Sequence, residues 1–183
     1  MKKFSTLISF LLFTSIVCDA QNLNNNWTSD LETELREFTS CDDDMDCYEF
    51  SGKALQTVYK LNDFYRPQEK RFLRVSEIIA LVQDSKSWTM LGPAYKQDVL
   101  NQAQQHANGK KAVIAVYTGS NGLGHVALIL PGELQASGSW GLRVPNSASF
   151  LTAEPAKSYV GKGLSYAFTK QHLKDVVIFT RNY

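Results

Sequence analysis

Cys47 is the residue of this chain with the clearest potential to act as a nucleophile. The apolar residues that follow it recur at the spacing of one helix face: Phe50, Ala54, Val58 and Leu61. Acidic residues stand directly before it and can cap such a helix. The thiol would then lie in the first helical turn, where unpaired backbone N–H groups and the helix dipole favour the reactive thiolate.

Cys47 also has a structural interpretation, because Cys41 lies only a few residues before it. Two cysteines this close in an exported protein can form a local disulfide, and a cysteine on an apolar stripe can simply be buried. A disulfide would remove the thiol that catalysis needs. The sequence leaves both interpretations open.

His125 is the second residue with catalytic potential, as the base that a thiol requires. It opens a β-prone run directly after the glycine-rich segment 119–124. A base must lie within hydrogen-bond reach of the thiol, and a third polar group must hold the tautomer of the base. Because Cys47 is expected on a helix and His125 on a strand, the pair can form only if that helix packs on the sheet. A packed or surface histidine is the alternative.

Residues 1–20 have the layout of a secretory signal peptide, with two lysines, an apolar run from Leu7 to Val17 and a small residue, Ala20, at the end. Cleavage after Ala20 would place the protein in the periplasm or outside the cell. The alternative is that Cys18 is kept and lipidated, although the residues before it make a poor processing site. No other run of about eighteen apolar residues occurs, so we expect no further transmembrane segment.

Composition excludes several classes of function. The net charge of +1 and the lack of a Lys/Arg cluster argue against a nucleic-acid partner. The chain has three histidines, far apart, and the two cysteines that remain after cleavage lack a second pair, so we expect no metal site. The glycine-rich segment has neither the lysine nor the following helix of a phosphate loop. We therefore expect no cofactor.

The periodicity of the apolar residues changes from helical to strand-like near Gly109. Helices are expected over residues 29–39, 47–61, 75–82 and 93–108. Strands are expected over 111–118 and 125–130, paired as a hairpin, and near 134–140, 142–145, 164–168 and 175–180. Helices followed by an antiparallel sheet indicate an α+β fold. After a flexible leader at 21–28, residues 29–183 are predicted to form a single domain.

Several short segments resemble one family. They are Asn-Gly-Lys-Lys-Ala-Val-Ile-Ala at 108–115, Gly-His-Val-Ala at 124–127, Pro-Gly at 131–132, Trp-Gly at 140–141, Val-Pro at 144–145 and Gly-Leu-Ser-Tyr-Ala-Phe at 163–168. Together with a cysteine on the first core helix, they are similar to the papain-like amidases that cut bacterial cell-wall peptides, the NlpC/P60 and CHAP group. The resemblance covers about residues 41–180. It implies a papain-like fold, with N-terminal helices packed on a C-terminal antiparallel sheet.

The resemblance implies Cys47 as nucleophile, His125 as base and a polar third residue after the His125 strand. Asn146 is our choice for the third residue, with Ser149, Ser137 and Ser139 as rivals. The surroundings of Cys47 depart from the family pattern, because Tyr48 and Glu49 follow it where small residues are usual. The nearby carboxylates would raise the pKa of the thiol, so an ion pair with protonated His125 would have to outweigh them.

Trp88 and Trp140 are candidates for the walls of a substrate groove, with core packing as the alternative. The leading hypothesis is thus a secreted cysteine hydrolase that cleaves amide bonds of cell-wall peptide through an acyl-enzyme. Peptidoglycan peptide would be its substrate, and an inhibitor or immunity protein a possible partner. The second hypothesis is a non-enzymatic secreted binding or inhibitory domain with a Cys41–Cys47 disulfide. The thiol state separates the two.

Overall fold

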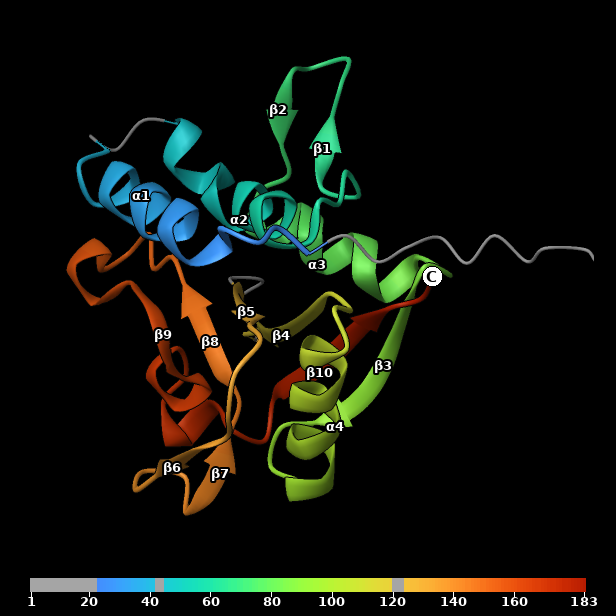
Figure 1. The fold of residues 1–183 in the computed structure, drawn as a ribbon, viewed down its shortest axis with the longest axis vertical. Helices are drawn as coiled ribbons and strands as arrows, with labels where there is room; N and C mark the ends of the chain where they lie inside the picture. The colour runs from blue at the N-terminus through green and yellow to red at the C-terminus, as the bar shows by residue number, and fades with distance from the viewer. Residues whose placement is uncertain (1–22, 42–44, 120–123) are drawn as a thin grey trace, which may run out of the picture.

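The computed structural model describes residues 23–41, 45–119 and 124–183. The expected signal peptide lies outside these residues. Within them the chain forms an α+β fold with four α-helices and a six-stranded antiparallel sheet (Figure 1). The α+β prediction is confirmed.

The four helices are α1 (Trp27–Thr39), α2 (Phe50–Tyr59), α3 (Val75–Asp84) and α4 (Gln97–Asn108). Short 3₁₀ turns add η1 (Met45–Glu49), η2 (Pro155–Lys157), η3 (Leu164–Tyr166) and η4 (Lys170–His172). In Figure 1, α1, α2 and α3 lie together above the sheet, while α4 lies at the opposite end of the molecule.

The six strands pair in the order β3–β10–β4–β5–β8–β9, with every neighbour antiparallel. In chain order they are β3 (Trp88–Pro93), β4 (Val113–Thr118), β5 (Gly124–Ile129), β8 (Asn146–Ser149), β9 (Tyr159–Gly163) and β10 (Val176–Arg181). Two small hairpins stand apart from the sheet: β1 (Tyr65–Arg66) with β2 (Arg71–Phe72), and β6 (Gln135–Ser137) with β7 (Leu142–Val144).

A separate hydrophobic core covers each face of the sheet. One core packs α1, α2 and α3 against alternate residues of the central strands, including Ile114, Val126 and Leu128. The other core packs α4, Trp140 and Phe168 against the intervening residues of the same strands, such as Ala127 and Ile129, whose side chains point to the opposite face. Because side chains alternate along a strand and both faces are covered, β4 and β5 are apolar at nearly every position.

The hairpin prediction is confirmed, since β4 and β5 pair in register from Val113 opposite Ile129 to Thr118 opposite Gly124. The helix expected after Cys47 packs on the sheet, where the Tyr59 hydroxyl donates to the carbonyl of Ile129 at 2.6 Å. The helix therefore reaches the sheet as predicted, although it begins at Phe50 and not at Cys47.

Several element predictions were wrong. The helix expected from Pro93 begins at Gln97, because Pro93 ends β3 opposite Val177 of β10. Residues 164–168 form a 3₁₀ turn and not a strand. Strands β3, β8 and β9 were not predicted. Gly and Pro end β3, β8 consists of small and polar residues, and β9 contains two glycines, so none of the three shows the regular alternation that marks a strand.

Residues 23–28, the described part of the expected leader at 21–28, contact the rest of the domain. Helix α1 begins at Trp27, and the Asn24 amide donates to the carbonyl of Val58 at 2.9 Å. Leu23 and Trp27 pack against the core. In the described part of the chain, no helix has the length and apolar character needed to cross a bilayer.

Candidate functional site

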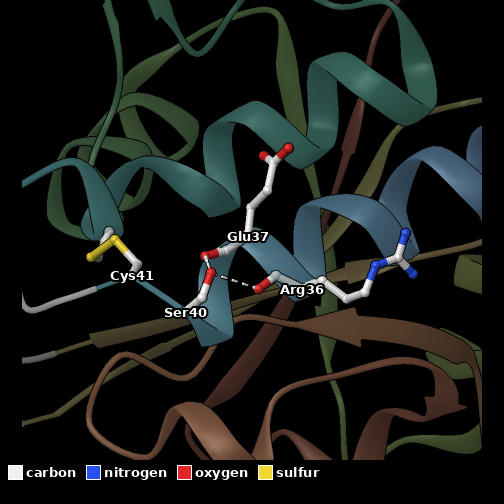
Figure 2. Close-up of a disulfide and its surroundings, with 5 residues drawn as sticks. Arg36, Glu37, Ser40 and Cys41 are labelled. Carbon is white, nitrogen blue, oxygen red and sulfur yellow. Dashed lines mark hydrogen bonds between the residues drawn. A yellow bond between two sulfur atoms is a disulfide. The ribbon is translucent and has the colours of Figure 1, made fainter.

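Cys47 forms a disulfide with Cys41, with their Cα atoms 6.0 Å apart. Figure 2 shows this bond at the C-terminal end of α1, where the Ser40 hydroxyl donates to the carbonyls of Arg36 and Glu37 at 3.1 and 3.0 Å. Cys47 lies in the 3₁₀ turn η1, ahead of α2, and its side chain is 8% exposed. Its sulfur is therefore neither at the helix start nor a free thiol.

His125 lies on the other face of the sheet from the helices around Cys47. Neighbouring side chains on a strand point to opposite faces. Gly124 lies against Ile79 of α3, on the face that α2 also covers. His125, one residue later, points the other way and contacts the ring of Phe168, with the centroids 5.3 Å apart. The structure thus does not bring Cys47 and His125 together.

His125 is held by a polar partner within an apolar setting. Its Nε2 lies 2.7 Å from the hydroxyl oxygen of Ser149 on the neighbouring strand β8. Burial lowers the pKa of His125 to about 4, because it penalises the charged imidazolium. The ring is therefore neutral at neutral pH.

Asn146 is not the partner of His125. Its side-chain amide donates to the carbonyl of Pro131 at 2.9 Å, and its side-chain oxygen accepts from Gln135 at 3.2 Å. Asn146 lies beside the end of β5, where its carbonyl accepts from the amide of Leu130 at 2.8 Å, while His125 lies near the strand's beginning.

Among the three serine rivals, Ser149 contacts His125. Ser137 and Ser139 contact each other in the β6–β7 hairpin, with their hydroxyl oxygens 3.2 Å apart. Ser149 is itself completely buried, so no substrate carbonyl can reach its hydroxyl. The Ser149–His125 contact orients the imidazole but provides no nucleophile.

Trp88 and Trp140 are core residues, 5% and 6% exposed. Trp88 stacks on Phe64 at 5.3 Å and donates its indole N–H to Asp63 at 3.1 Å. Trp140 donates its indole N–H to the backbone carbonyl of Phe168 at 3.3 Å. Neither ring offers a face to a ligand, although Trp140 supports the backbone of a residue beside His125.

A hollow of about 450 Å³ opens beside His125. Its walls are mostly aromatic or apolar: Tyr117, Leu151, Ala167, Phe168 and His172. The rings of Tyr117 and His172 stack, with centroids 4.3 Å apart and planes at 22°. Apolar walls around a few polar groups are typical of small-ligand sites.

The segment that follows β8 separates this hollow from the disulfide. Glu154 and Lys157 line the hollow and form an ion pair at 2.5 Å on its rim. Thr152 and Pro155 of the same segment instead lie beside the two cysteines. The segment 151–157 thus lies between Cys47 and the hollow beside His125.

Sequence reasoning missed the residues that form the hollow with His125. Tyr117 lies directly opposite His125 in the β4–β5 register, so the predicted hairpin carried a signal for it. Phe168 and His172 come from the turns before β10 and reach the hollow only through the tertiary fold. No local pattern marks them.

No group of three or more potential ligands lies together in the described residues, so none of them is assigned to a metal. Comparison of the chain with protein-family models and with curated proteins finds no match.

Proposed function

We propose that this chain is an exported binding domain of papain-like fold that holds a cell-wall peptide without cutting it. The observation that carries the proposal is the Cys41–Cys47 disulfide. A sulfur in a disulfide cannot attack a carbonyl, because the thiolate is the nucleophile. The peptide ligand and the papain-like fold come from the sequence resemblance, and export comes from the signal-like residues 1–20.

The position of His125 supports binding in place of catalysis. Its neutral ring can exchange hydrogen bonds with a ligand but carries no charge to stabilise a thiolate. It also lies on the sheet face away from α2. A hydrolase would need the base within hydrogen-bond reach of the nucleophile.

The hollow beside His125 has features that suit a short peptide. The stacked rings of Tyr117 and His172 offer an apolar wall for an aliphatic side chain. The exposed Glu154–Lys157 pair on the rim presents both a carboxylate and an ammonium. A peptide with a free amine and a free carboxylate can exchange partners with both groups.

The cysteine hydrolase expected from the sequence stays a prediction. It requires that the disulfide be reduced and that Cys47 find a base other than neutral His125. The same experiment tests both functions.

The experiment incubates purified protein with cell-wall sacculi and measures free thiols, released amines and protein that sediments with the sacculi. We expect no free thiol, no released amine and co-sedimentation that excess wall-derived peptide reverses. The Cys41→Ser variant, which frees Cys47, should also release no amine. Amine release by the wild type that is lost in Cys47→Ser would overturn the proposal, as would failure to bind sacculi and peptide.

A matched pair of histidine variants tests the place of binding. His172→Ala removes half of the stacked wall and should weaken peptide binding about tenfold. His106→Ala alters a histidine on α4 that hydrogen-bonds Thr180 and should leave peptide binding unchanged. Equal binding by the two variants would place the peptide elsewhere.

A further inference from the structure

We propose that the site continues past the His125 hollow onto Tyr166 and that this extension binds an oligosaccharide. Tyr166 lines both the His125 hollow and a second hollow of about 270 Å³. Its side chain is 66% exposed. Ser165 lines both hollows too, so the two hollows adjoin at residues 165 and 166. The inference rests on the proposed function for its ligand, because the glycan and peptide of a bacterial cell wall are covalently joined.

The ring of Tyr166 is held in place although it is exposed. It packs on the ring of buried Tyr159, with centroids 6.0 Å apart and planes at 65°. Tyr159 is itself fixed by the Ser147 hydroxyl, 2.9 Å from its own. The Lys162 ammonium lies 5.4 Å from the centroid of Tyr166 and 5.9 Å from that of Tyr159. A supported aromatic ring loses little conformational entropy on binding, which suits it to act as a platform.

The second hollow is lined by small and hydroxyl-bearing residues: Ala136, Ser137, Gly138, Ser139 and Ser165. Serine hydroxyls both donate and accept hydrogen bonds, as sugar hydroxyls do. The apolar C–H face of a sugar ring can lie against the face of Tyr166. The Lys162 ammonium beside that ring can donate to an acetamido or carboxylate oxygen.

This combination favours a saccharide over a peptide side chain. A peptide side chain gains affinity from a deep apolar pocket, and the apolar walls here belong to the His125 hollow. Hydroxyls next to an exposed, fixed ring match a ligand that has an apolar face and a polar edge. The two hollows thus differ in chemistry, as the two parts of a glycopeptide do.

The test measures binding of peptide-free N-acetylglucosamine oligomers to the full protein by calorimetry. We expect the tetramer to bind at least tenfold more tightly than the monosaccharide, because only the longer ligand can cross Tyr166 between the hollows. Equal affinity for the two lengths, or no saccharide binding at millimolar concentration, would overturn the inference.

Two variants act on the extension in different ways. Tyr166→Ala removes the platform and should weaken tetramer binding at least tenfold, while Tyr166→Phe keeps the ring face and should retain most of it. Gly138→Leu adds a large side chain to a residue that lines the second hollow and should weaken tetramer binding. The fold should tolerate it, because a Cβ at Gly138 meets no atom within 4 Å. Tyr95→Ala changes another exposed tyrosine and is the matched control. Unchanged binding by Tyr166→Ala or Gly138→Leu would contradict the proposed place of binding.

Failure of this inference and failure of the proposed function are distinguishable. A glycan-free wall peptide reports on the His125 hollow, and a peptide-free oligomer reports on Tyr166. Peptide binding without saccharide binding would contradict the oligosaccharide site and leave the proposed function standing. Saccharide binding that Tyr166→Ala abolishes, without any peptide binding, supports the extension and removes the peptide from the proposed function.

Discussion

His125 shows how the surroundings of one residue decide what it can do. As a strand residue beside a glycine-rich segment it could have been an exposed base. Burial beside Phe168 instead lowers its pKa to about 4, so the ring is neutral at neutral pH. A neutral imidazole can exchange hydrogen bonds with a bound ligand, whereas an ion pair with a thiolate needs the charged form of the ring.

The lowered pKa of His125 predicts a pH dependence of stability. The folded state disfavours the imidazolium, so the contribution is fully present above the ordinary pKa of 6.5 and is lost as pH falls toward 4. The loss is at most about 3 kcal/mol. Urea unfolding at pH 7.5, 5.5 and 4.5 should show a steeper decline for the wild type than for His125→Gln, which cannot titrate. Parallel curves for the two proteins would contradict this assignment.

A buried carboxyl group lies at the contact between helices α1 and α2. Glu34 of α1 is buried and accepts a hydrogen bond from the Thr57 hydroxyl of α2. Its Oε2 has no hydrogen-bond partner in the described part of the chain. Burial raises the pKa of Glu34, so the folded state favours the protonated acid and the charged form costs stability at neutral pH.

Glu34→Gln should therefore raise the free energy of unfolding at pH 7 by about 1 kcal/mol, because an amide keeps an acceptor for Thr57 without the buried charge. The gain should shrink as pH falls and Glu34 takes up its proton. Chemical denaturation at pH 7 and pH 4 measures both effects. Glu32→Gln changes an exposed carboxylate on the same helix and is the control. A destabilised Glu34→Gln protein at pH 7 would refute the argument.

The β1–β2 hairpin depends on a second carboxylate with the opposite shift. The Nη1 and Nη2 atoms of Arg71 donate to the carboxylate of Glu77 of α3 at 2.7 and 2.8 Å, and these bonds lower the pKa of Glu77 to about 2. Stability from the pair is present above the ordinary pKa and is lost as pH falls toward 2. Glu77→Gln should lower the free energy of local unfolding of the hairpin by about 1 kcal/mol. Faster hydrogen exchange at Leu73, whose amide bonds Phe64, measures the loosening; unchanged exchange would count against it.

In the whole molecule, the disulfide and the proposed binding site lie in different places. Cys41–Cys47 closes the connection between α1 and α2 on one face. The His125 hollow and Tyr166 lie on the other side of the strap formed by residues 151–157. Stability and binding should therefore respond separately to loss of the disulfide.

The double variant Cys41→Ser, Cys47→Ser should lose about 2 kcal/mol of unfolding free energy, the amount expected for a short closed loop. Its affinity for wall peptide should stay within about twofold of wild type. Reductant should reproduce the loss in the wild type and have no effect on the double variant, which is the control. If the double variant also lost peptide binding, the binding site would depend on the disulfide, and the prediction would be wrong.

Local sequence patterns were enough to predict the α+β class and the β4–β5 hairpin. These follow from local periodicity: 3.6 residues for helices such as α3, and continuous β-prone runs for Val113–Thr118 and Gly124–Ile129. For Cys47 the sequence favoured a catalytic thiol and gave the disulfide with Cys41, which the structure contains, only as the alternative.

The surroundings of His125 could not be predicted from the sequence. The face to which His125 points depends on which helices cover each side of the sheet, and a single step along a strand reverses it. Its partner Ser149 lies on a strand without a clear pattern, and Phe168 and His172 arrive from distant turns. Spacing along a chain fixes the neighbours within one element, whereas contacts between elements depend on how the whole core packs.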